Sequence, residues 1–447
     1  MLWLPLLFQG NVANLTMSGT MRRGKGTLAR REQRLAYGLL LPTFLLIFSI
    51  VMLPLIANFW ISVKPITLAD LRPPTLIVKE QLRGNIEQAG DSAKIRYRFR
   101  NSSIKYPLTS VEFSDDLPDG LLIKNLDPLC SVFDEAQKQK NLLVCDLGKL
   151  DPKSRGRIEI EVQADTQFSH LKKVLKDSVP VTKFETYNVL TSLDFTLKNF
   201  KKVFSATEFW DVLKVSFYYT VFGTAGALLF GVFAALILQK SFPGRPIVRG
   251  LMLFPYVAPV IAVAFSWIVL LDPFSGALNA MLIQMDVVST PINFFGQRTV
   301  GVEIFGFSFS FPLALTMVIL FEIWRYFPLS FLFILARMQS IPSDIYEAAE
   351  IDGASPIQQF WFLSLPFIAG ILAILFLLRF IWTFNKFDDI FLLTGGNAGT
   401  RTLTVSVYEQ AFAISNLGAG AAVAVVIFVL LLFFALIFIR LSPKDTG

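Results

Sequence analysis

Six stretches of apolar residues stand out along the chain, separated by segments that carry most of the charged positions. An α-helix rises 1.5 Å per residue, so about 20 residues cross the roughly 30 Å hydrocarbon core of a membrane. Each stretch is at least this long, and the pattern therefore predicts six transmembrane helices. They cover Ala36–Ile61, Val215–Leu238, Leu251–Leu271, Phe311–Leu335, Leu365–Phe384 and Leu417–Ile439.

The third apolar stretch is interrupted by Pro255 and Pro259. Proline lacks a backbone donor and clashes with the preceding turn, so it breaks a helix unless neighbouring groups satisfy the freed carbonyls. The two prolines indicate a span that is interrupted because it lines a cavity. A simple packing kink is the alternative.

The segment between the first two spans has a different pattern. Hydrophobic and polar residues alternate from Lys94 to Arg100, which is typical of a strand with one buried face. The buried positions that this pattern predicts are Ile95, Tyr97 and Phe99. The same alternation recurs at Val111 and Phe113 and at Ile158, Ile160 and Val162. We therefore expect an all-α transmembrane bundle with an inserted β-sandwich-like domain.

Basic residues beside the spans predict their orientation, because Lys and Arg next to a span stay on the cytoplasmic side. The segment before the first span carries Arg22, Arg23, Lys25, Arg30, Arg31 and Arg34. The loop with Lys240, Arg245 and Arg249 and the tail with Arg440 and Lys444 agree with a cytoplasmic N-terminus. The predicted parts are a cytoplasmic N-terminus (1–35), a first transmembrane helix (36–61), an extracytoplasmic insertion (62–210), a transmembrane core (211–440) and a cytoplasmic tail (441–447).

Composition supports a membrane environment. Hydrophobic residues make up 53% of the chain and charged residues only 17%, which departs from soluble domains and makes lipid the expected surroundings. The net charge of +7 lies largely beside the spans, and no basic face interleaved with aromatic residues is found. We therefore expect no nucleic-acid partner.

The insertion holds both cysteines of the chain, Cys130 and Cys145. On the oxidising side of a membrane two nearby cysteines favour a disulfide over two free thiols. Two cysteines and one histidine leave no cluster suited to a zinc site, so no metal site is expected. No arrangement of Ser, His and Asp or of paired carboxylates points to a catalytic residue.

A regular motif precedes the fifth span, within residues 337–366. It runs Glu347, Ala348, Ala349, three residues, Gly353, nine residues, Leu363, one residue, Leu365 and Pro366. We expect Ser343 to cap a first short helix whose first turn carries Asp344. Gly353 permits a left-handed stop, and Ser355 with Pro356 begins a second helix.

This motif resembles the EAA loop of binding-protein-dependent ABC importers, with Leu363 in place of the family's Ile. The resemblance extends over roughly residues 193–447 and is closest to the maltose-type sugar permease subunit. Further matching residues are Leu253 to Pro259, Trp324, Pro328, Phe384 to Phe387 and Leu392 to Gly396. The resemblance implies the type I ABC importer permease fold, in a multi-pass protein of the bacterial cytoplasmic (inner) membrane.

The resemblance also implies partners. In such importers the EAA loop docks in a groove of the ATPase subunit, and the coupling residues here are Glu347, Ala348, Ala349, Asp352, Gly353 and Pro366. The expected assembly contains a second homologous permease subunit, two ATP-binding cassette subunits and an extracytoplasmic solute-binding protein. ATP and Mg²⁺ belong to the cassette subunits, so this chain needs no cofactor and is not itself an enzyme.

The resemblance also implies where the solute passes. The positions that correspond to the family's sugar site lie on two spans. They are Arg325, Tyr326 and Leu329 on the fourth span and Arg379, Trp382, Thr383 and Lys386 on the fifth. Charged residues inside a membrane are costly and are functional by default. The alternative is that these cations form ion pairs with Glu322, Asp388 or Asp389.

The expected function is import of a sugar or sugar-like solute, such as an oligosaccharide, a glycoside or a polyol. A non-sugar solute such as a polyamine or phosphate is the alternative within the same class. The insertion resembles the immunoglobulin-like repeats of bacterial surface proteins around Gly90 to Arg100, Asp115 to Gly120 and Leu147 to Leu150. That likeness leaves a membrane receptor or adhesion protein as a more distant alternative.

Overall fold

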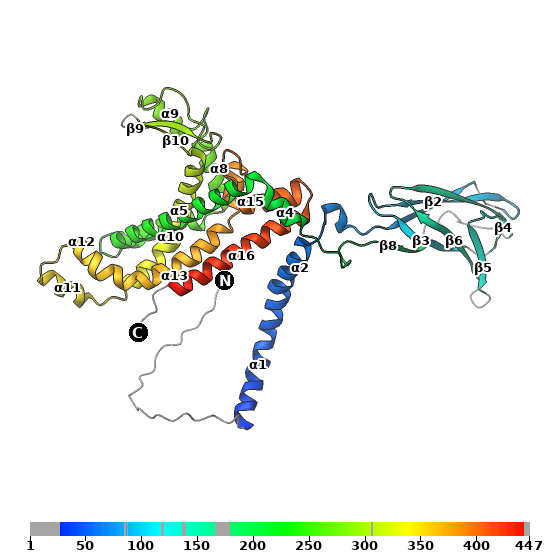
Figure 1. Cartoon of the computed structure of the whole chain (residues 1–447), viewed down its shortest axis with the longest axis horizontal. Helices are drawn as coiled ribbons and strands as arrows, with labels where there is room; N and C mark the ends of the chain where they lie inside the picture. The colour runs from blue at the N-terminus through cyan, green and yellow to red at the C-terminus, as the bar shows by residue number, and fades with distance from the viewer. Residues whose placement is uncertain are drawn as a thin grey trace. The chain divides into compact units, whose positions relative to one another are not determined.

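The computed structural model describes residues 27–84, 86, 88–117, 120–135, 140–165, 179–304 and 307–441 (Figure 1). Most of the basic N-terminus, including Arg22, Arg23 and Lys25, and the tail with Lys444 lie outside the described residues. The chain divides into two compact units, with the boundary between Ala57 and Asn58.

Five helices of the described chain are long and apolar enough to cross a membrane, and a sixth span is formed if a bent pair counts as one. The five are Gln33–Ser62, Thr207–Leu238, Leu313–Met338, Pro356–Phe384 and Leu417–Leu441. The fourth predicted span begins two residues late, because Phe311 belongs to a strand and Pro312 precedes the helix. The fifth begins earlier, at Pro356. The second short helix of the EAA segment, which we define as residues 337–366, continues directly into the span.

These spans contain the following elements. The first comprises α1 (Thr27–Ile47), a π-helical turn (Phe48–Met52) and α2 (Leu53–Ser62), and the others are α5 (Thr207–Leu238), α10 (Leu313–Met338), α13 (Leu365–Phe384) and α16 (Leu417–Leu441). Shorter helices are α4 (Lys198–Ser205), α9 (Ala277–Gln284), α11 (Ser343–Ile351), α12 (Pro356–Gln359), α14 (Asp388–Thr394) and α15 (Leu403–Tyr408). Strands β9 (Val300–Ile304) and β10 (Phe307–Phe311) form a small antiparallel pair.

The bent pair confirms that prolines interrupt the third span. Helices α6 (Arg245–Met252) and α7 (Phe254–Val257) are followed by α8 (Val260–Leu270), and the two halves meet at 92°. Ala258 has an extended backbone, and Pro259 is the N-cap of α8. The break therefore falls at the second proline, whereas Pro255 is accommodated in the first turn of α7.

Small residues allow α5 to lie close to α10. A methyl group added at Gly231 would come within 2.8 Å of Ser330 Cβ, and one added at Gly226 would collide with Ile323. Glycines at such positions are typical of helix pairs in membranes, where close backbone approach replaces hydrophobic driving force. Toward the C-terminal end of both helices, Ala235 and Phe331 belong to a buried cluster that α13 completes with Leu375.

The insertion folds into two four-stranded antiparallel sheets. Its strands are β1 (Leu76–Arg83), β2 (Ser92–Asn101), β3 (Leu108–Leu117), β4 (Leu121–Asn125), β5 (Cys130–Glu135), β6 (Lys140–Leu150), β7 (Arg155–Ala164) and β8 (Val181–Thr186). The strand orders are β1-β2-β7-β4 and β5-β6-β3-β8.

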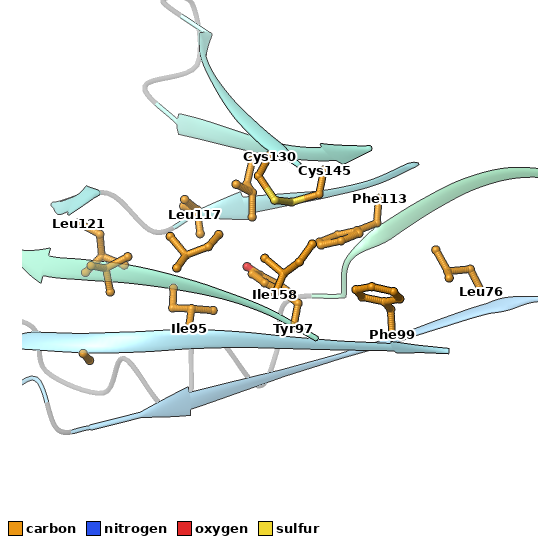
Figure 2. Close-up of a cluster of buried hydrophobic side chains, with 14 of the residues drawn as sticks. Leu76, Ile95, Tyr97, Phe99, Phe113, Leu117, Leu121, Cys130, Cys145 and Ile158 are labelled. Carbon is orange, nitrogen blue, oxygen red and sulfur yellow. A yellow bond between two sulfur atoms is a disulfide. The ribbon is translucent and has the colours of Figure 1, made fainter. Parts of the chain in front are cut away.

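The inner faces of the two sheets share one hydrophobic core, drawn in Figure 2. Ile95 and Tyr97 are fully buried and Phe99 nearly so, which confirms the alternation expected for this strand. The hydroxyl of Tyr97 donates a hydrogen bond to Asp115 Oδ2 at 2.7 Å. Burial and the neighbouring Asp115 carboxylate raise the pKa of this phenol, so it stays neutral in its apolar surroundings.

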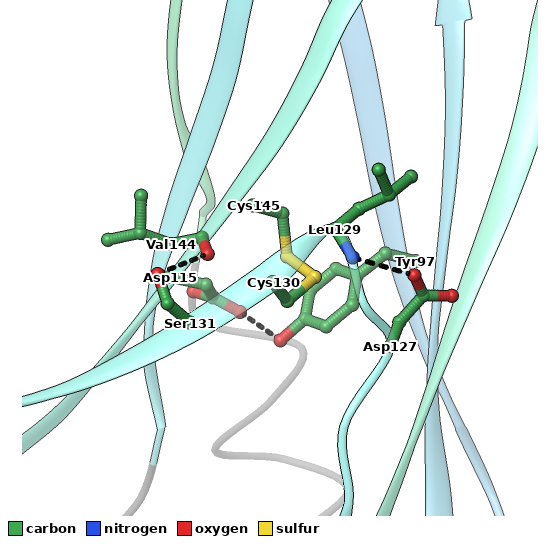
Figure 3. Close-up of a disulfide and its surroundings, with 8 residues drawn as sticks. All are labelled: Tyr97, Asp115, Asp127, Leu129, Cys130, Ser131, Val144 and Cys145. Atoms are coloured by element: carbon green, nitrogen blue, oxygen red, sulfur yellow. Dashed lines mark hydrogen bonds between the residues drawn. A yellow bond between two sulfur atoms is a disulfide. The ribbon is translucent and has the colours of Figure 1, made fainter.

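A disulfide links the edge strand of the second sheet, β5, to its neighbour β6. Cys130 on β5 lies directly opposite Cys145 on β6, and the structure bonds the two sulfur atoms (Figure 3). Both cysteines belong to the buried core of the insertion.

Polar contacts tie the two chain ends of the insertion together. The fully buried ammonium of Lys64 donates to the carbonyls of Val189 and Ser192, and it lies 4.5 Å from the ring centroid of Trp60. The Asn199 side chain donates to the Lys64 carbonyl at 2.7 Å. A buried cation requires such partners, so this arrangement fixes where the chain enters and leaves the insertion.

Candidate functional site

The EAA segment begins with α11. Its N-cap is Pro342, and Ser343 is the first helical residue, with its hydroxyl 3.3 Å from Asp344 Oδ1. The expectation that Ser343 caps this helix is therefore wrong. Pro342 already has the non-helical backbone of an N-cap, so the helix begins at Ser343 itself, one residue earlier than a Ser343 cap requires.

The bend after α11 follows the expected backbone chemistry. Gly353 has a φ of +79°, the left-handed conformation predicted for it, and no atom lies within 4 Å of a methyl group added there. Ser355 caps α12, because its hydroxyl accepts from the Gln358 amide while Gln358 Oε1 accepts from the Ser355 amide at 2.8 Å. This reciprocal pair is a capping box. Two short helices therefore meet at the glycine.

The surface of the EAA segment is available to another protein. No residue of α11 is buried, and Glu347, Ala348 and Asp352 are exposed. Ile351 is 86% exposed and Ile357 is 71% exposed, so apolar side chains flank the bend on the outside. Large exposed apolar side chains beside acidic ones are typical of an interaction surface. A hydrogen bond of 2.9 Å between Tyr346 and Ser364 links α11 to the start of the following span.

Five of the seven residues predicted for the solute pathway gather around two buried carboxylates. Glu322 on α10 accepts hydrogen bonds from Arg379 at 2.6 Å, from Thr383 at 2.9 Å and from Tyr219 at 2.9 Å. The carboxylate and all three donors are buried. This group connects α5, α10 and α13 through one side chain.

Asp389 on α14 is the second buried carboxylate. Its oxygens lie 4.0 Å from Arg325 Nε and 3.9 Å from Lys386 Nζ, and neither oxygen accepts a hydrogen bond. Lys386 also lies 3.6 Å from Asp388. The three cations therefore face three carboxylates, which is the ion-paired alternative considered from the sequence. A balanced charge cluster lowers the cost of holding such groups inside a membrane.

Tyr326 lies at the centre of the cations. Its ring centroid is 4.5 Å from the Arg379 guanidinium, 4.5 Å from Lys386 Nζ and 5.5 Å from the Arg325 guanidinium. Cations at these distances are attracted to the face of the ring. The Arg325 guanidinium also donates to the carbonyl of Ala258 at 3.3 Å, at the break of the third span.

The other two predicted residues are not part of this cluster. Trp382 is 53% exposed, and Leu329 is half-buried one turn beyond Tyr326. Tyr219, in turn, was not predicted. The only signal for it was a hydroxyl within an apolar span, which does not reveal its partner. No group of three potential metal ligands is found among the described residues.

Comparison with known proteins identifies the family. Residues 227–445 match the model of the family described as "Binding-protein-dependent transport system inner membrane component". The chain is 34% identical over 235 residues to the inner membrane ABC transporter permease protein YcjO of Escherichia coli, covering 53% of this chain and 75% of that protein. The chain belongs to this family of ABC importer permeases. The matched residues include α10, the EAA segment, α13 and α16.

Two further comparisons agree. The permease is 32% identical over 248 residues to the trehalose/maltose transport system permease protein MalF of Thermococcus litoralis, covering 55% of this chain and 79% of that one. Its fold resembles a solved bacterial ABC transporter involved in the import of the acidic polysaccharide alginate. That match has a TM-score of 0.50 and 20% identity, covering 57% of this chain and 86% of the other. The permease is therefore a multi-pass transport component of the inner membrane.

Proposed function

We propose that this permease carries a sugar or sugar-like solute, such as an oligosaccharide, a glycoside or a polyol, across the bacterial cytoplasmic membrane. The observation that carries the proposal is the 32% identity to a protein named for trehalose and maltose transport. A polyamine or phosphate is the alternative solute. Three carboxylates face three cations in the buried cluster, so the cluster has no net charge that would attract a polyamine or a phosphate ion.

The EAA segment transmits ATP hydrolysis to the spans. In this proposal Glu347, Ala348, Ala349, Asp352, Gly353 and Pro366 meet one of two ATP-binding cassette subunits, which hold ATP and Mg²⁺. The support is the exposed α11 with its flanking apolar side chains and its bond to Ser364 at the start of the span. A force applied to α11 reaches α13 through this short connection.

The EAA segment and both termini face the cytoplasm, and the insertion faces outside as a β-sandwich-like, immunoglobulin-like domain. The support is the loop after α5, whose basic residues Lys240, Arg245 and Arg249 are typical of a cytoplasmic loop. A solute-binding protein delivers the solute from outside. A second homologous permease subunit completes the pathway, which runs past Tyr326, Leu329 and the exposed ring of Trp382.

Uptake into proteoliposomes tests the solute class. The permease is reconstituted with its partner subunits, ATP is enclosed on the cytoplasmic side, and labelled maltose, trehalose, a polyol, a polyamine and phosphate are compared. ATP-dependent uptake of at least one saccharide or polyol is expected. Uptake of the polyamine or phosphate alone would show that the proposed solute class is wrong.

A further inference from the structure

The outer face of the sheet β1-β2-β7-β4 is built from four rows of side chains, set by the strand register. One row contains Lys79, Arg98 and Arg157, and the next contains Ile77, Arg100 and Arg155. Lys79 and all four arginines are exposed. Two Arg–Arg pairs thus lie directly opposite each other on neighbouring strands.

In the other two rows of the same face, the cations of β2 pair with carboxylates of β7. Lys94 lies 2.5 Å from Glu161, and Arg96 lies 2.7 Å from Glu159 across the same pair of strands. By contrast, Arg98, Arg100, Arg155 and Arg157 have no ion pair with any residue that the structure describes. The face therefore has one half in which β2 and β7 form ion pairs and one half in which they carry only cations. Arg83 on β1 is a further cation, opposite Lys94.

Like charges directly opposite on adjacent strands destabilise a sheet. A glutamate at position 155 or 157 would remove this repulsion, as Glu159 and Glu161 do in the neighbouring rows. Local features that lower stability without a compensating contact are expected at functional sites. The cationic half of the face is therefore a candidate for binding an anion.

A cleft of about 1100 Å³ adjoins this cationic half. Arg100 and Arg155 line it together with Arg72 and Lys153. Its single acidic lining residue is already engaged, because Asp70 accepts from Thr67 and lies 3.1 Å from Lys105. The cleft thus continues the positive charge of the sheet into a concave site.

Two tyrosines also line the cleft. The ring centroids of Tyr106 and Tyr187 are 5.3 Å apart with 48° between their planes. Aromatic faces beside polar groups suit ligands that are apolar on one side and polar on the other, as sugar rings are. Guanidinium groups bind carboxylates through two parallel hydrogen bonds.

We propose that the cationic half of this sheet and the adjoining cleft bind a carboxylated oligosaccharide. The arginines hold the carboxylates, and Tyr106 and Tyr187 contact the faces of the sugar rings. A concave cleft with aromatic walls fits a chain of rings better than the convex surface of an acidic protein. This inference rests on the proposed function only in that the importer handles saccharides, and binding is measured without transport.

The test uses the full chain in nanodiscs of zwitterionic lipid. Calorimetry compares oligogalacturonate, as the carboxylated probe, with a neutral oligosaccharide of the same length and with a polyglutamate peptide. Oligogalacturonate is expected to bind most tightly, with an affinity that falls as salt rises. Replacing Arg98→Gln together with Arg157→Gln should weaken it at least about tenfold, as expected for lost charge-assisted pairs.

The neighbouring rows supply the matched control. Lys94→Gln with Arg96→Gln also removes two cations from this face, but from ion pairs, so binding should change less than with Arg98→Gln and Arg157→Gln. The Arg98→Gln, Arg157→Gln variant should unfold at the same or a higher temperature than wild type, because repulsion is relieved. Binding loss with a preserved fold therefore separates a ligand site from a structural role.

Three outcomes would overturn the inference. They are undetectable oligogalacturonate binding, equal or tighter binding of polyglutamate, and equal or tighter binding to vesicles that contain phosphatidylglycerol. A failure of this inference can be distinguished from a failure of the proposed function. Saccharide uptake with no oligogalacturonate binding rejects the insertion site alone, whereas binding without any saccharide uptake rejects the solute class alone.

Discussion

The guanidinium of Arg379 on α13 lies 2.6 Å from the carboxylate of Glu322 on α10, and both side chains are buried. Removing one partner of such a pair leaves an unpaired buried charge. Glu322→Gln should therefore lower the free energy of unfolding by about 3 to 5 kcal/mol. The measurement is thermal unfolding of the purified permease in detergent.

The double variant Glu322→Gln, Arg379→Gln is the control for this pair. It removes both charges, so it should be more stable than Glu322→Gln alone. A double variant that is less stable than the single one would show that the ion pair does not explain the effect.

Gly353 allows a test of coupling. A side chain at a φ of +79° is strained, whereas the space around the position is open, so the effect arises from the backbone. Gly353→Val with Glu347→Lys should leave solute binding intact while abolishing stimulation of the ATPase. Gly250→Ala is the matched control, because Gly250 also has open space but no positive φ. Normal transport by the double variant would contradict the coupling role.

The disulfide closes a loop with a sequence separation of 15 residues. Cross-linking a loop of this length stabilises a fold by about 3 kcal/mol in the chain-entropy description. Cys130→Ser with Cys145→Ser should lower the stability of the insertion by a comparable amount. Thermal unfolding measures the loss, and mass spectrometry of the wild type should find the two cysteines bonded. Free thiols after isolation from an oxidising compartment would refute the bond.

Asp70 gives a pH-dependent contribution to stability. Burial raises the pKa of its carboxyl, but hydrogen bonds from Thr67 and the nearby Lys105 outweigh burial and lower the pKa below 3.8. A depressed folded-state pKa stabilises the fold above the unfolded value, and this contribution disappears as pH falls through the folded value. Asp70→Asn should therefore unfold at a lower temperature than wild type at pH 7. The two should converge in acid below the lowered pKa, and a constant difference would contradict this role.

Trp382 provides a test of the proposed pathway. Trp382→Ala should raise the half-saturation concentration for uptake several-fold, as truncation of an aromatic anchor typically costs about 2 kcal/mol or more. Trp361 is the matched control, because it is 59% exposed on the same continuous helix but lies within the EAA segment, at the opposite end of that helix from Trp382. Trp361→Ala should leave the half-saturation concentration unchanged. Unchanged uptake by Trp382→Ala, Thr383→Ala and Arg325→Ala would show that the proposed pathway is wrong.

The sequence by itself determined the spans and the local bends. Apolar runs must be helical in a bilayer, where each backbone group needs an internal partner. Gly353 and the pair Ser355 and Pro356 act through their own backbone conformations, so their neighbours in sequence were enough to predict them. The alternation in β2 likewise follows from the period of a strand. The prediction for Ser343 was wrong because Pro342 takes the N-cap position and the helix already begins at the serine.

Only the tertiary structure decided which distant groups meet. Glu322 lies 57 residues from Arg379 and 103 residues from Tyr219, and their contact depends on how α5, α10 and α13 pack. The alternation of β2 showed that its arginines share a face, but only the register with β7 placed Arg98 opposite Arg157. Local sequence specifies backbone conformation, whereas the partner of a charge is specified by packing between elements far apart along the chain.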